Sequence, residues 1–219
     1  MMYGTTFPLL RAAAPDWQAY VGHAFVQGLA DGSLPRANFL RYLVQDYLFL
    51  IHFSRAWALA VTKADTLEEM RACAATVQAL LKDELSLHVR ICEAAGIALA
   101  DLGAAQEHPA TLAYTRYVMD AGHSGDFLDL LVVLAPCVLG YGEIGLRLRG
   151  AGGPYADWIE TYGGAGYQAL CADVGARLDQ AAARRIGPPG SGPRWPALCT
   201  RFATATRLEA AFWDMGLAP

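Results

Sequence analysis

The sequence predicts an all-α bundle of about seven to eight helices, folded as a single domain over residues 1–219. Three observations support this prediction. Nearly every segment repeats its apolar residues with the helical period, and no segment of four or more residues alternates cleanly as a strand does. The segments are joined by short turns, and 54% of the residues are hydrophobic, which is enough to fill one large core.

Start and stop signals divide the chain into the expected helices. Ser33 and Thr66 are typical N-caps, Pro35 and Pro154 lie in expected first turns, and Gly32 and Gly96 follow expected helix ends. The segment 98–107 is expected to be a loop. The expected helices are Pro15–Leu29, Ser33–Ala64, Thr66–Ala95, Pro109–Gly122, Asp126–Leu148, Pro154–Tyr162, Tyr167–Ile186 and Trp195–Met215.

The chain is organised around the apolar segment Leu130–Leu148, which we expect to be buried on most sides. Pro136 should bend this helix, because proline removes one backbone N–H. Cys137 follows directly, and Tyr141 lies one turn later on the same face. This pair is either a reactive thiol beside a phenol or a core cysteine beside a core tyrosine.

Composition narrows the classes of partner. The net charge is −4, the pI is about 5.7 and no basic helix face is present, so neither nucleic acid nor an anionic membrane is expected to bind. No uncharged apolar run reaches the ~20 residues of a membrane span. The N-terminus does not resemble a signal peptide, and the five cysteines are scattered and odd in number. We therefore expect reduced thiols and a cytoplasmic location.

A carboxylate lies among aromatic residues in the second expected helix. Asp46 shares a face with Phe49 and Phe53, and burying it without a partner would be costly. Its partner is either a ligand or a core arginine such as Arg41 or Arg55.

A second carboxylate, Glu209, shares a face with Phe212 and Trp213 in the last expected helix. Alone, it would be interpreted as an exposed glutamate beside an apolar stripe. Taken together, the two carboxylates, the thiol and the many aromatic residues indicate a pocket for a flat, polar, nitrogenous ring.

Metal and nucleotide sites are not expected. His88 follows Glu84 by four residues, but a carboxylate-bundle di-iron site uses Glu-x-x-His twice, and this sequence has no second copy. No glycine-rich phosphate loop and no serine-hydrolase motif occurs.

Five segments resemble the TenA family, also called thiaminase II or aminopyrimidine aminohydrolase, in the family's order. They are YLVQDYLFL (42–50), HPATLAYTRYV (108–118), LAPCVLGYGEIG (134–145), YADWIETYGG (155–164) and LEAAFWDMG (208–216). The resemblance implies a haem-oxygenase-like helical fold without haem or any other cofactor, assembled as a homotetramer.

The resemblance also implies roles for single residues. Cys137 matches the catalytic cysteine of the family's cysteine-containing branch, Glu209 the catalytic glutamate, and Asp46 the pyrimidine-binding aspartate. Phe49 stands where many members carry tyrosine, so a hydrogen bond from that hydroxyl is missing. The remaining residues that resemble pocket positions are Tyr114, Tyr141, Tyr162 and Phe212.

The implied activity is hydrolysis of 4-amino-5-aminomethyl-2-methylpyrimidine to its hydroxymethyl counterpart, together with cleavage of thiamine. The alternative is a non-catalytic protein that binds a pyrimidine or thiamine. A DNA-binding regulator is disfavoured, because the chain is acidic and lacks a basic recognition helix.

Overall fold

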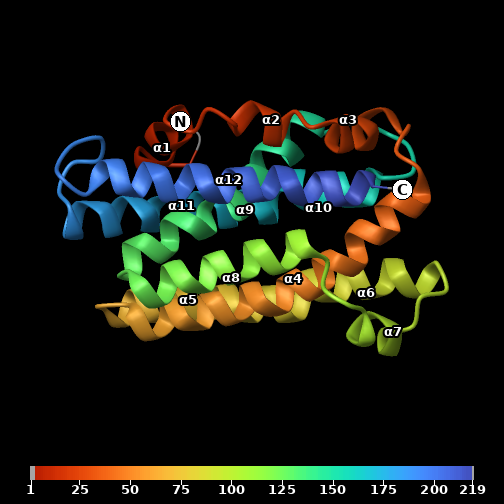
Figure 1. Cartoon of the computed structure of the whole chain (residues 1–219), viewed down its shortest axis with the longest axis horizontal. Coiled ribbons are helices and arrows are strands. Elements are labelled where there is room, and N and C mark those ends of the chain that lie inside the picture. The colour runs from red at the N-terminus through yellow and green to blue at the C-terminus, as the bar shows by residue number, and fades with distance from the viewer. Residues whose placement is uncertain (1–2, 219) are drawn as a thin grey trace. The chain divides into compact units, whose positions relative to one another are not determined.

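The computed structural model describes residues 3–218, apart from the side chain of Asp83, and confirms an all-α chain without strands in that range (Figure 1). The elements are α1 (Thr6–Ala12), α2 (Trp17–Val21), α3 (Ala24–Asp31), α4 (Arg36–Lys63), α5 (Leu67–Ala79), the π-helix η1 (Leu80–Glu84), α6 (Leu85–Ala94), α7 (Leu99–Ala104), α8 (Pro109–Ser124), α9 (Phe127–Leu148), α10 (Ala156–Gly163), α11 (Ala165–Arg185) and α12 (Trp195–Leu217).

The described residues contain more helices than the seven to eight expected, because short helices escape a periodicity search. The expected helix Pro15–Leu29 is two helices, since the backbone of His23 is extended and its Nδ1 accepts a hydrogen bond from the Phe25 N–H at 3.2 Å. The expected loop 98–107 contains α7. Ser33 is not the N-cap of α4; Pro35 occupies that position.

The capping signals around the third expected helix are confirmed. The Thr66 hydroxyl accepts from the Glu69 N–H at 3.2 Å, and the Glu69 carboxylate accepts from the Thr66 N–H at 3.3 Å. Gly96 has a φ of +86°, as a glycine after a helix end requires. Between these ends the helix is not uniform, because η1 interrupts it.

The chain divides into two compact units. The first unit comprises the residues up to Leu34 together with Leu131–Asp214, and the second comprises Pro35–Leu130 with the residues from Met215 onward. That the chain folds as a single domain stays a prediction.

In the second unit, α4 is the spine. Helices α5, α6 and α8 all pack directly against it, and they run alongside it in Figure 1. The long aromatic sequence of α4 follows from this position, because a helix covered on several sides needs apolar residues on several faces.

Helix α9 is the most apolar helix. It has the length and composition of a membrane span, contrary to the expectation from the sequence, but 89% of its most hydrophobic window is buried inside the protein. Asp129 lies in the first turn of α9. Its carboxylate accepts a hydrogen bond from the Asp126 N–H at 3.0 Å and so caps the start of the helix.

Candidate functional site

The backbone around Cys137 is held by side chains of the first unit. The Tyr20 hydroxyl donates to the carbonyl of Pro136 at 3.2 Å, and the Tyr167 hydroxyl donates to the carbonyl of Val138 at 3.3 Å. The Cys171 thiol donates to the same Val138 carbonyl at 3.4 Å. The carbonyls on both sides of Cys137 thus have side-chain donors, which hold the backbone on either side of its thiol.

Cys137 itself is 9% exposed, on α9 and directly after Pro136. Gly140 permits this arrangement, because a Cβ there would lie 2.4 Å from the ring of Tyr20. The bend expected at Pro136 stays a prediction, and the tyrosine that packs against Gly140 was not expected from the sequence.

The predicted pocket residues Tyr141 and Tyr162 are brought together. Their ring centroids lie 5.0 Å apart in an edge-on arrangement, and both side chains are buried. Trp213 lies 5.3 Å from Tyr141, and Trp158 lies 4.6 Å from Tyr162. The first unit therefore contains a four-ring aromatic cluster that begins one turn after Cys137.

Glu209 and Phe212 lie on α12, and both are buried. Glu209 is 2% exposed, so the interpretation of Glu209 as a surface residue is wrong. A carboxylate is buried only where the fold offers it hydrogen bonds or where it has a chemical task. Cys137, Glu209, Tyr141, Tyr162 and Phe212 thus all belong to the buried interior of one unit.

Asp46 belongs to the second unit and is buried on α4. Its Oδ2 accepts a hydrogen bond from the Tyr42 hydroxyl at 2.8 Å and lies 2.6 Å from Nε2 of His88. The prediction that a core arginine such as Arg41 or Arg55 is the partner of Asp46 is wrong. Arg41 donates to the carbonyl of Ala218, and Arg55 contacts His52.

The other two predicted residues of this unit also meet. The ring centroids of Phe49 and Tyr114 lie 4.9 Å apart. The ring of Phe49 also stacks on that of Phe53, with 5.2 Å between their centroids. Phe49 is buried, and its ring packs against both of these rings.

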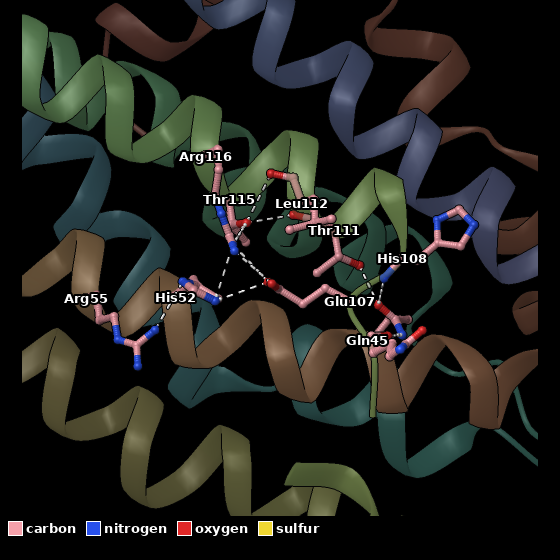
Figure 2. Close-up of polar contacts among 10 residues, drawn as sticks. Gln45, His52, Arg55, Glu107, His108, Thr111, Leu112, Thr115 and Arg116 are labelled. Atoms are coloured by element: carbon pink, nitrogen blue, oxygen red, sulfur yellow. Dashed lines mark hydrogen bonds and ion pairs between the residues drawn. The ribbon is translucent and has the colours of Figure 1, made fainter. Parts of the chain in front are cut away.

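Figure 2 shows how α8, which carries Tyr114, is tied to α4, which carries Phe49. Gln45 lies next to Asp46 in sequence and binds the segment before α8. Its Oε1 accepts from the His108 N–H at 2.8 Å and from the Thr111 hydroxyl at 2.7 Å, while its Nε2 donates to the carbonyl of Gln106 at 2.9 Å. Gln45 uses three of its hydrogen-bonding positions in this way and fixes the start of α8.

A second connection between the same helices involves His52. Its Nε2 lies 3.1 Å from Glu107 and 3.3 Å from Arg116 on α8, and its Nδ1 accepts from Arg55 at 3.2 Å (Figure 2). Burial lowers the pKa of His52, and the nearby charge of Glu107 raises it. The charges of Arg116 and Arg55 lower it again, so the pKa of His52 is below its ordinary value. The lowered pKa favours the neutral form of the His52 ring.

Several functional contacts were missed by sequence reasoning. Tyr42 could have been found, because it precedes Asp46 by four residues and therefore shares its face. His88 and Gln45 gave no local signal, since their partners lie 42 to 66 residues away along the chain.

Nδ1 of His88 lies 2.9 Å from the backbone carbonyl oxygen of Glu84. Among the residues described, no group of three or more His, Cys, Asp or Glu side chains is arranged to hold a metal ion.

Similarity to known proteins decides the family. The family model described as TENA/THI-4/PQQC matches residues 10–218. The chain belongs to this family. A curated relative from Halalkalibacterium halodurans, named aminopyrimidine aminohydrolase, is 35% identical over 94% of this chain and 92% of its own length.

Solved structures agree with this assignment. A protein from Silicibacter sp. TM1040, described as a TenA family transcription regulator, is 58% identical, covers 100% of this chain and 99% of its own, and has a TM-score of 0.97. A domain of unknown function from Shewanella denitrificans, described as having a heme oxygenase-like fold, has a TM-score of 0.73 at 14% identity over 97% of this chain and 92% of its own. The haem-oxygenase-like fold is therefore confirmed.

Proposed function

We propose that this chain is an aminopyrimidine aminohydrolase of the cysteine-containing branch, with thiaminase II activity on thiamine. The observation that carries the proposal is the buried thiol of Cys137, one turn before the aromatic cluster of Tyr141 and Tyr162, in a relative of curated aminopyrimidine aminohydrolases. An apolar and aromatic interior with a few polar groups suits a flat heterocycle.

The proposed reaction begins with addition of the Cys137 thiolate to a ring carbon beside a ring nitrogen. Glu209 delivers a proton to that nitrogen, so the ring accepts the electron pair without building up negative charge. The electron pair then expels the group on the exocyclic methylene. Water adds to that carbon and loses a proton, and departure of the cysteine restores the aromatic ring.

For the aminomethylpyrimidine the net change is one C–N bond broken by water, which releases ammonia and forms the hydroxymethylpyrimidine. For thiamine the same steps release the thiazole. In this proposal Asp46 accepts a hydrogen bond from the pyrimidine amino group, and Tyr114, Phe49 and Phe212 supply ring contacts. No cofactor takes part.

The test is turnover of 4-amino-5-aminomethyl-2-methylpyrimidine, followed as ammonia release. The wild type should turn over, Cys137→Ala should lose nearly all activity, and Cys199→Ala should keep it, because Cys199 is a partly exposed thiol without a proposed role. Equal rates for the wild type and Cys137→Ala would reject covalent catalysis.

One observation favours a second function, a binding protein without turnover. Phe49 brings no hydroxyl to a position where the resemblance to the family implies a tyrosine in many members. Tight pyrimidine binding with no product from either pyrimidine or thiamine would favour this function. We also propose that the chain forms a homotetramer, which light scattering would show as about four times the mass of one chain.

A further inference from the structure

His88 is buried at 0% exposure on α6 and directly contacts Asp46 on α4. Both contacts of the Asp46 carboxylate, from Tyr42 and from His88, are made to Oδ2. No hydrogen bond joins Oδ1 to any residue that the structure describes. One carboxylate oxygen is thus held by the fold, and the other remains available as an acceptor.

The protons of this cluster can be counted. Nδ1 of His88 lies 2.9 Å from the carbonyl oxygen of Glu84, which only accepts, so Nδ1 carries a proton. A neutral imidazole has no second proton, yet Nε2 lies 2.6 Å from Oδ2 of Asp46. A proton must lie between these two atoms, so the pair is either imidazolium with carboxylate or imidazole with carboxylic acid.

The surroundings favour imidazolium. Burial alone would lower the pKa of His88, but the hydrogen bond and charge of Asp46, with the charge and backbone carbonyl of Glu84, outweigh it and raise that pKa. The groups that act on the ring are therefore Asp46 and Tyr42 from α4 and Glu84 on its own turn.

The local helix geometry is unusual at this position. The π-helix η1 ends at Glu84, and the N–H of Leu85 bonds back five residues to the carbonyl of Leu80. A π-turn holds one more residue than an α-turn, so it rotates the following helix by about one residue, roughly 100°, relative to a regular continuation. This rotation sets the face of α6 on which His88 lies.

We propose that His88 is the positioning residue for Asp46: it carries the shared proton and engages Oδ2, so that Oδ1 accepts from the amino group of the pyrimidine. The inference rests on the proposed function for the identity of the ring, but it concerns recognition rather than turnover.

An ionised carboxylate selects a donor. A pyrimidine with an amino group at C4 offers an N–H from that group to Oδ1, whereas the corresponding 4-oxo compound has a carbonyl oxygen there, which a carboxylate repels, and carries its N–H on a ring nitrogen instead. The preference for amino over oxo therefore reports whether Oδ1 is held in place as an acceptor, and His88 should control this preference.

The test compares His88→Gln with the wild type and with His52→Gln. Glutamine keeps a neutral donor near the position of Nε2 but cannot carry the proton. His52→Gln is the matched control, because His52 contacts Arg55 and Glu107 rather than Asp46. Calorimetry measures binding of 4-amino-5-hydroxymethyl-2-methylpyrimidine and of its 4-oxo counterpart, which needs no turnover.

The wild type and His52→Gln should prefer the amino compound, and His88→Gln should lose about tenfold or more of that preference. In ¹⁵N-histidine spectra of the wild type near pH 6.5, both ring nitrogens of His88 should be mostly protonated, whereas Asp46→Asn should shift this signal toward that of a neutral ring. These spectra decide the charge of His88 even if His88→Gln does not fold.

Three results would overturn the proposal: an unchanged preference in folded His88→Gln, a neutral His88 in the wild-type spectra, or a wild type that binds neither pyrimidine. The last result also rejects the proposed function. Binding of the amino compound with the expected preference, but without hydrolysis, rejects the hydrolase proposal alone and supports the role of His88.

Discussion

Substitution of Gly145 by alanine should both destabilise the protein and disturb the aromatic cluster. Gly145 lies on α9, where a Cβ would meet three backbone atoms of the segment at the end of α10. The distances are 2.3 Å to the carbonyl carbon of Tyr162, 2.5 Å to the nitrogen of Gly163 and 2.6 Å to the carbonyl oxygen of Tyr162. No rotamer change relieves these contacts, so α10 must move away from α9.

The magnitude follows from two opposing effects. Overpacking of a well-packed region costs ~1–3 kcal/mol, and rigid backbone places this site at the upper end. Alanine recovers ~0.5–1 kcal/mol by its better helix propensity. The net loss of about 2 kcal/mol corresponds to a decrease of ~4–8 °C in melting temperature for a chain of this size.

Circular dichroism would measure the melting temperature, and ammonia release would measure activity. The matched control is Gly166→Ala on α11, where a Cβ meets nothing within 4 Å, so its melting temperature should be unchanged or slightly higher. Because the backbone that meets Gly145 carries Tyr162, activity should fall at temperatures where Gly145→Ala is still folded. Equal melting temperatures for the two variants would refute the close approach of α9 and α10.

Three further predictions concern the second unit. Thr66→Ala removes the hydroxyl that caps α5 and should lower the free energy of unfolding by ~1 kcal/mol, measured by urea denaturation; no change would contradict the capping box. His88 has a raised pKa in the folded state, so its protonation stabilises the fold fully below the ordinary pKa of about 6.5, and this contribution is lost as pH rises through the folded value. The melting temperature of the wild type should therefore exceed that of His88→Gln most at pH 5–6 and less at alkaline pH, and a gap that widens with pH would be inconsistent. Glu107→Gln removes the charge that opposes the lowering of the His52 pKa, so an NMR titration should show that pKa falling further, while a rise would rule out the assigned partners.

The sequence predicted what depends on local signals. The all-α class, the start of α5 at Thr66 and its continuation to Gly96 all follow from periodicity and capping within a few residues. The break at Gly22 and His23 was missed, because a half-polar segment with the helical period can be one helix or two. Tertiary packing decides between them.

In the candidate site, too, local sequence and tertiary packing decide different features. Its place among aromatic residues singled out Asp46, but reasoning from that helix alone left its partner open between a ligand and an arginine such as Arg41 or Arg55. The actual partner, His88, depends on the packing of α6 against α4 and on a π-turn that shifts its face. No pattern within α4 carries that information, because the two residues are 42 positions apart.

The most direct test of the central claim is product analysis with the purified wild-type chain and 4-amino-5-aminomethyl-2-methylpyrimidine. The proposed chemistry predicts equal amounts of ammonia and 4-amino-5-hydroxymethyl-2-methylpyrimidine, both absent with Cys137→Ala. Recovery of the unchanged pyrimidine from the wild type, with thiamine also intact, would contradict a hydrolase and leave a pyrimidine-binding protein.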